Sequence, residues 1–154
     1  MTSRMERSYR IAAVDTGSTF GLMLALYDTL SGNLRRAAIA LRSQDIERRC
    51  SELSHAYLVI GQLESWIDPD SDRQLSESLT LFYAHLRSQM LQASLTQSAP
   101  ALEALMALVV QVRTAWQQRA MDMQQSRVVS TEGPIYDTTS QIAEDRRMAL
   151  SQTA

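Results

Sequence analysis

The amino-acid sequence predicts an all-α fold: an antiparallel up-and-down four-helix bundle with an N-terminal arm and a short C-terminal helix. Three observations predict it. Apolar residues recur every three or four positions through four long stretches. No segment between Phe20 and Gln125 alternates apolar and polar residues with a period of two. The connections at 42–45, 68–74 and 96–100 are short, and short connections favour antiparallel neighbours.

The length of the chain bounds its domain organisation. With 154 residues, 45% of them apolar, it is expected to form one domain around one core. We expect an N-terminal arm over residues 1–18, a helical bundle over 19–125 and a flexible tail over 126–154. Gly133-Pro134 breaks a continuing helix, and Thr138 with Gln141 can cap a short helix that runs through Leu150.

The first two helices follow from apolar stripes and their end signals. Ser18 is a suitable N-cap for a first helix from Thr19 to about Arg42. Its stripe comprises Phe20, Met23, Tyr27, Leu30, Leu34, Ala37 and Leu41. Ser43 and Asp45 are starting signals for the second helix, and Asp68-Pro69-Asp70 is its stop. The second stripe comprises Ile46, Cys50, Leu53, Tyr57, Ile60 and Ile67.

The third and fourth helices are predicted in the same way. The third stripe comprises Leu75, Leu79, Phe82, Leu86, Met90 and Ala93. The fourth comprises Leu102, Leu105, Val109, Val112, Trp116 and Met123. Ser98 and Pro100 mark the start of the fourth helix, because proline is tolerated in a first helical turn. Phe82 and Trp116 are expected to anchor the core.

Composition argues against several classes of partner and site. A net charge of -2 gives no basic excess for binding nucleic acid. The single cysteine cannot form an internal disulfide, which fits a reducing compartment such as the cytoplasm. The polar N-terminus is unlike a secretory signal, and no apolar run reaches the ~20 residues that span a bilayer, so no membrane insertion is expected.

We interpret the side chains that could bind a metal or act in catalysis as structural. Glu52 and His55 have the Glu-x-x-His spacing of di-iron bundles, but the other ligands of such a site are missing, so we interpret them as a solvated helix face. Cys50 is assigned to core packing. Asp28 is expected to make a structural hydrogen bond or to lie on the surface. The two histidines, His55 and His85, lack a nucleophile partner, and no Gly-rich phosphate loop is present. The sequence therefore predicts no catalytic residue, no metal site and no cofactor.

The helices carry more apolar residues than one core-facing stripe requires. The surplus comprises Ala56, Val59, Leu63 and Trp66; Leu81, Leu91 and Leu95; and Ala101, Ala104, Leu108 and Val110. One interpretation is that central helices of a bundle are buried on two sides. The other is a groove that receives an amphipathic partner segment. Both interpretations fit the pattern.

Short motifs in a fixed order resemble one protein family. They are Tyr9 with Val14-Asp15-Thr16-Gly17-Ser18; Leu26-Tyr27-Asp28; Leu79 with Tyr83; and Val112-Arg113 with Trp116. Over about Tyr9 to Gln118 the chain resembles the FliS family of flagellin-specific export chaperones. It departs from the family pattern at Thr29, Ser78, Phe82 and His85, and Asp72-Arg73 replaces a Gly-Gly before the third helix.

The resemblance implies a cytoplasmic helical bundle that has no enzymatic activity. Such a protein binds the disordered C-terminal segment of flagellin or a related flagellar client, prevents premature polymerisation and contacts the export apparatus. With the apolar surplus, it indicates client-binding residues in the arm and on the bundle: Tyr9, Ile11, Val14, Ala56, Val59, Leu63, Trp66, Leu81 and Leu108. The alternative is a structural or regulatory bundle that self-associates or binds another helical partner.

Overall fold

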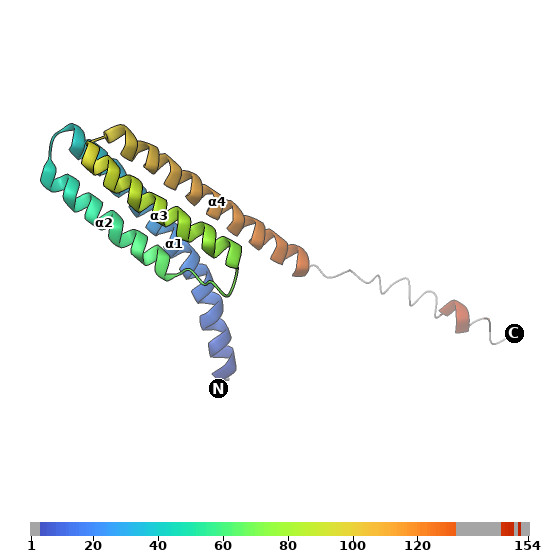
Figure 1. Cartoon of the computed structure of the whole chain (residues 1–154). Helices are drawn as coiled ribbons and strands as arrows, with labels where there is room; N and C mark the ends of the chain where they lie inside the picture. Colours follow the sequence, from blue (N-terminus) through green and yellow to red (C-terminus); the bar gives the residue numbers. More distant parts are fainter. Residues whose placement is uncertain (1–3, 132–145, 150, 152–154) are drawn as a thin grey trace. The chain divides into compact units, whose positions relative to one another are not determined.

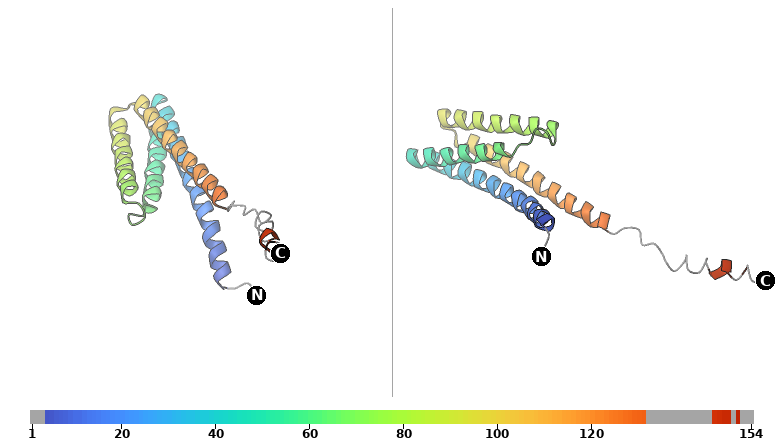
Figure 2. Two further views of the ribbon diagram at one scale, coloured as in Figure 1. Left: turned by 90° about the vertical axis from the view of Figure 1, so that its right-hand side faces the viewer. Right: turned by 90° about the horizontal axis from the view of Figure 1, so that it is seen from below.

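The computed structural model describes residues 4–131, 146–149 and 151, with side chains described from Thr19 to Ser130 and at 146–149 and 151. Four long helices follow one another: α1 (Arg4–Arg42), α2 (Ile46–Ser65), α3 (Arg73–Thr96) and α4 (Ala99–Thr131) (Figure 1). The chain divides into two units, Met1–Gln117 and Gln118–Ala154, and α4 runs across the division. Within the first unit successive helices run in opposite directions, which confirms the predicted all-α bundle (Figures 1 and 2).

Helix α1 begins earlier than the sequence predicted. It starts at Arg4, so Ser18 lies inside the helix and the prediction that Ser18 is its N-cap was wrong. No proline interrupts residues 4–42, and an isolated glycine such as Gly17 costs a helix only about 1 kcal/mol, so nothing in this segment stops the helix. The backbone of Tyr9, Ile11 and Val14 is helical, and their side chains lie outside the described ones.

The first turn of α2 is capped as predicted. The Asp45 side chain accepts a hydrogen bond of 3.0 Å from the backbone N–H of Arg48. The residue before it, Gln44, has a φ of 59°, a left-handed conformation that lets α1 reverse into α2 within a few residues. Helix α2 ends at Ser65, where Trp66 is the C-cap.

The ends of α3 and α4 are defined in a similar way. Gln97, with a φ of 52°, ends α3 in the left-handed conformation, and the Ser98 hydroxyl accepts a hydrogen bond from the backbone N–H of Ala101 at 3.2 Å. Helix α4 continues to Thr131, past the predicted end near Gln125. The breaker Gly133-Pro134 lies outside the described residues.

The core draws on all four helices. It comprises Tyr27, Leu30, Leu34, Ala37 and Ala38 of α1; Leu53, Ala56, Ile60 and Leu63 of α2; Tyr83, Leu86, Met90 and Ala93 of α3; and Ala99, Leu102, Leu105 and Val109 of α4. Most of the predicted stripes are therefore confirmed. Phe82 and Trp116 are half-buried and pack against this core, so they contribute to it without being its most buried anchors.

Three predicted core residues are instead exposed. Ile46, Cys50 and Met123 face solvent, and the assignment of Cys50 to core packing was wrong. The buried stripe of α2 begins only at Leu53, so its first turn lies beyond the covered part of the helix. Met123 lies in the second unit, beyond Gln117. Of the predicted helix 138–150, residues 146–149 are helical, and 138–145 and 150 lie outside the described residues.

Candidate functional site

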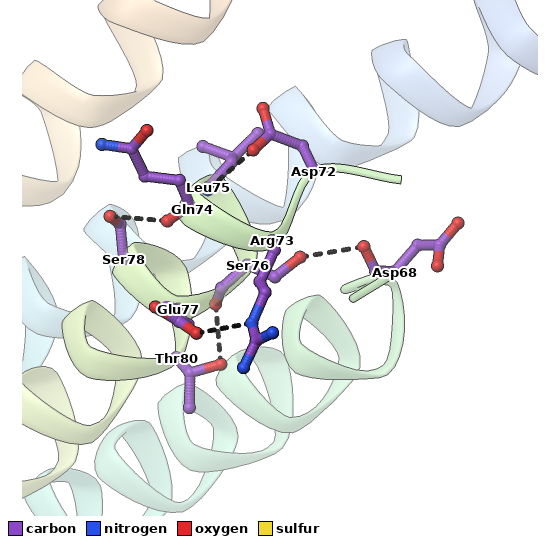
Figure 3. A network of polar contacts seen from close by, with 9 residues as sticks. All are labelled: Asp68, Asp72, Arg73, Gln74, Leu75, Ser76, Glu77, Ser78 and Thr80. Carbon is purple, nitrogen blue, oxygen red and sulfur yellow. Dashed lines mark hydrogen bonds and ion pairs between the residues drawn. The ribbon is translucent and has the colours of Figure 1, made fainter. Parts of the chain in front are cut away.

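The connection between α2 and α3 is fastened to the first turn of α3 (Figure 3). The Asp72 side chain is the N-cap and accepts a hydrogen bond of 3.0 Å from the backbone N–H of Leu75. Ser76, which is buried, donates its hydroxyl to the backbone carbonyl of Asp68 at 2.8 Å. On the exposed side Arg73 pairs with Glu77 at 3.1 Å. These bonds hold residues 68–72 in a fixed path at one end of the bundle.

A cavity of about 190 Å³ opens beside this connection. Most of its wall is apolar or aromatic, and its polar lining comes from the α2–α3 connection and from Ser76. Its lining comprises Met23, Leu63, Trp66, Ile67, Asp68, Ser71, Asp72, Leu75, Ser76, Leu79, Tyr83 and Trp116. Both tryptophans of the chain contribute to this one wall. The site-residue prediction included Trp66 and Leu63 but none of the others.

A hydrogen-bonded aromatic group borders the cavity. The hydroxyl groups of Tyr27 and Tyr83 lie 2.7 Å apart, and the indole N–H of Trp116 donates to the Tyr27 hydroxyl at 3.3 Å. Burial raises the pKa of the Tyr27 hydroxyl despite the hydrogen bonds from Tyr83 and Trp116, which act in the opposite direction. Burial also raises the pKa of Tyr83, and the neighbouring Tyr27 adds to that effect. Both tyrosines therefore stay neutral and link α1 to α3 and α4.

A second, shallower hollow also borders the α2–α3 connection. Its volume is about 1010 Å³, and it shares Ile67 and Ser76 with the first cavity. The remaining lining comprises Glu64, Pro69, Asp70, Arg73, Glu77, Thr80 and Leu81. Leu81 is 72% exposed, so this hollow opens onto the outer face of α3.

That outer face of α3 carries a row of exposed apolar residues. Leu81, Leu91 and Leu95 are 72%, 56% and 76% exposed, and Ala84 and Ser88 complete the spacing of three or four residues between them. None of these five residues is charged. Because neighbouring positions at this spacing share one side of a helix, they form a continuous uncharged strip, which we call the α3 leucine row.

The predicted site residues fall into different environments. Ala56 and Leu63 are buried in the core; Val59, Trp66 and Leu108 are half-buried against it; and Leu81 is exposed. The apolar surplus thus divides between the two interpretations of the sequence. Part of it completes the core, and the part formed by Leu91, Leu95 and Leu81 faces solvent. The row could have been found in the sequence from its spacing.

Glu52 has a structural role that the sequence did not reveal. It accepts hydrogen bonds from Asn33 at 2.8 Å and from Arg36 at 2.9 Å, and it joins α2 to α1. The interpretation of Glu52 as part of a solvated face was therefore wrong, because its side chain is only 14% exposed. His55, in contrast, is exposed. Among the described residues, no three His, Cys, Asp or Glu side chains gather as a metal site would require.

Asp28 makes the predicted structural bond. Its carboxylate accepts a hydrogen bond from Nη2 of Arg113 at 3.0 Å and forms an ion pair with the same guanidinium. Arg113 and Trp116 are one helical turn apart on α4, and Tyr27 and Asp28 are adjacent on α1. Two neighbouring polar links therefore fasten α4 to α1.

Comparison with known proteins assigns the family. The family described as "Flagellar protein FliS" matches residues 1–124. The chain belongs to the FliS family. It is 28% identical to the flagellar secretion chaperone FliS of Salmonella typhimurium over 108 residues, which cover 70% of this chain and 80% of that protein. It is 26% identical to the chaperone of the same name from Bacillus subtilis over 120 residues, 78% of this chain and 89% of that protein.

Five of the residues that carry the FliS resemblance meet in the structure. Tyr27 and Asp28 come from the first helix, Tyr83 from the third, and Arg113 and Trp116 from the fourth. The two tyrosines and Trp116 form the hydrogen-bonded group beside the cavity, and Asp28 pairs with Arg113. The helical motifs around Tyr27, Tyr83 and Trp116, far apart in the sequence, therefore describe one meeting point of α1, α3 and α4. No described helix is both long and apolar enough to cross a membrane.

Proposed function

We propose that this protein is a cytoplasmic export chaperone that binds the disordered C-terminal segment of flagellin. Membership of the FliS family carries the proposal, together with the printed name of its relatives as flagellar secretion chaperones. Held on the bundle, that segment is withheld from other flagellin molecules, so premature polymerisation is prevented. The loaded chaperone then contacts the flagellar export apparatus and releases its client.

The α3 leucine row supports the proposal from the structure. Leu81 and Leu95 are fourteen residues apart, which corresponds to about 21 Å along a helix. An amphipathic client segment laid along the row would cover three exposed leucines and reach the shallower hollow that Leu81 lines. A client that orders on binding loses about 2–5 kcal/mol or more, so a long apolar contact surface is required. We also propose that the N-terminal arm, residues 1–18, covers the client-binding groove when the client is absent.

The experiment is a calorimetric titration of the protein with a peptide from the C-terminus of the flagellin of the same organism. Leu91→Asp and Leu95→Asp should each weaken binding strongly, since a carboxylate in a dry contact lacks a partner. In the free protein the same carboxylate stays hydrated, so circular dichroism should show unchanged helicity. Val128→Asp is the matched control, because Val128 is 63% exposed, between Leu91 at 56% and Leu95 at 76%, but lies in the second unit.

Two outcomes would redirect the proposal. A wild-type protein that ignores the peptide would refute the flagellin assignment. If Leu91→Asp at the same time converts a wild-type dimer into a monomer in light scattering, the leucine row serves self-association, which is the alternative function.

A further inference from the structure

The cavity beside the α2–α3 connection has the size of one large side chain. Apolar protein cavities of roughly 150 Å³ accommodate a benzene ring, and this cavity measures about 190 Å³. Met23, Leu75 and Leu79 supply aliphatic contacts, and Trp66 and Trp116 supply aromatic ones. The cavity therefore has room for an isoleucine, leucine or phenylalanine side chain.

The polar part of the wall has one sign of charge. The lining includes the acidic residues Asp68 and Asp72 and no arginine, although the chain contains 15 arginines. Arg73, the next residue along the chain, is bonded to Glu77 at 3.1 Å on the exposed side of α3. Figure 3 shows the Asp68 carboxylate pointing away from α3. Among the side chains that the structure describes, neither Asp68 nor Asp72 forms an ion pair, so an incoming cation would meet two negative charges beside an apolar cavity.

The two carboxylates are also held in place. Oδ1 of Asp68 accepts the backbone N–H of Asp70 at 3.0 Å, and Oδ1 of Asp72 accepts that of Leu75 at 3.0 Å. Because each carboxylate is fixed through one oxygen, little side-chain entropy is lost when a cation pairs with it. The geometry thus combines a preformed apolar cavity with preformed negative charge.

We propose that this cavity binds one large apolar side chain of the client that is directly followed by an arginine or lysine. The apolar side chain enters between Met23, Leu79 and Trp116, and the cation pairs with Asp68 and Asp72. The inference rests on the proposed chaperone role and adds the local chemistry of the client segment that the bundle recognises.

The test uses three short probes and nuclear magnetic resonance of the full chain. The probes are N-acetylated, amidated dipeptides: Phe-Arg, Phe-Gln and Phe-Glu. The indole N–H signals of Trp66 and Trp116 report directly on the cavity wall, since the chain has no other tryptophan. Phe-Arg should shift both signals and bind about two- to fivefold more tightly than Phe-Gln, the range of a solvent-accessible ion pair. Phe-Glu should bind most weakly, and raising the salt concentration should reduce the differences.

Matched variants isolate the charge from the fold. Asp68→Asn and Asp72→Asn keep the Oδ1 acceptors, and asparagine is as good an N-cap as aspartate, so both proteins should stay folded. The double variant should bind Phe-Arg and Phe-Gln equally. Glu47→Gln, an exposed charge removed from the opposite end of α2, should keep the wild-type preference. Leu75→Phe should fill part of the cavity and weaken all three probes.

The outcomes separate this inference from the chaperone role. Equal binding of the three probes to the wild type, or indole signals that none of them shifts, would overturn it. So would an undiminished preference for Phe-Arg in the double variant. If the flagellin peptide fails to bind but the dipeptides behave as described, the flagellin assignment fails and the cavity chemistry stands. If the flagellin peptide binds the double variant and the wild type equally, this inference fails alone.

Discussion

The hydroxyl groups of Tyr27 and Tyr83 form a 2.7 Å hydrogen bond inside the core, where the two residues are 0% and 2% exposed. A buried hydroxyl without a partner would cost about 1–3 kcal/mol, so the two tyrosines stabilise the fold only as a pair. The indole of Trp116 uses a further lone pair of Tyr27. Three helices are joined by this group without any charged residue.

Removing both hydroxyls of the pair should destabilise the protein by less than the sum of the two single removals. Tyr83→Phe leaves the Tyr27 hydroxyl with Trp116, so we expect a loss of about 1 kcal/mol. Tyr27→Phe leaves the buried Tyr83 hydroxyl without this partner, and we expect a loss of about 2 kcal/mol. The double variant should lose less than the sum of the two. Urea unfolding of the four proteins measures this double-mutant cycle, and strictly additive losses would contradict the pairing.

The same pair predicts a loss of stability at alkaline pH. Burial raises the pKa of both tyrosines above their ordinary value of 10.0. The unfolded chain therefore releases these protons above about pH 10, whereas the folded protein retains them, so the free energy of unfolding falls as pH rises from there. Below pH 10 this contribution is complete. Chemical unfolding between pH 8 and 11 should show a smaller decline in the Tyr27→Phe/Tyr83→Phe variant than in the wild type.

Glu52 should make the stability of the protein depend on pH in the acidic range. Burial raises the pKa of its carboxyl, but the bonds from Arg36 and Asn33 outweigh that effect and hold the pKa below its usual 4.5. The contribution of ionised Glu52 to the free energy of unfolding is therefore complete above its usual pKa of 4.5, and it is lost as pH falls through the lowered pKa. Glu52→Ala should cost about 1–3 kcal/mol at neutral pH, because Asn33 loses its partner.

A matched acid on the surface supplies the control for Glu52. Glu103 contacts Arg42, and both side chains are largely accessible, at 40% and 54%. Exposed ion pairs contribute little, so Glu103→Ala should leave the unfolding midpoint near that of the wild type. If Glu52→Ala and Glu103→Ala lower the thermal unfolding midpoint equally, the burial of Glu52 does not account for its contribution to stability.

The turn at Gln97 offers a stabilising substitution. Its φ of 52° is costly for a residue with a side chain, whereas glycine adopts this conformation readily. We expect Gln97→Gly to raise the free energy of unfolding by about 0.5–1 kcal/mol. Thr96→Gly, one residue earlier and inside α3, should lower it. A destabilised Gln97→Gly protein in thermal denaturation would contradict the interpretation of this turn.

Helical periodicity predicted the fold because each helix buries one stripe over many turns. The caps at Asp45 and Ser98 were also predictable, since they depend on residues close in the sequence. Cys50 was misplaced because periodicity cannot tell where along a helix the covering neighbours end. Glu52 was misinterpreted because its partners, Asn33 and Arg36, belong to another helix. The cavity required four segments to be brought together, and no local pattern contains that information.

Tyr27 and Asn33 stand six residues apart on α1, about 9 Å along its axis, and they bond to α3 and α2 respectively. Each residue inserted into a helix turns everything beyond it by about 100°. One extra residue between these positions would leave α1 able to align with one neighbour but never with both. The number of residues between Tyr27 and Asn33, more than their identity, therefore sets how α1, α2 and α3 are aligned along the bundle axis.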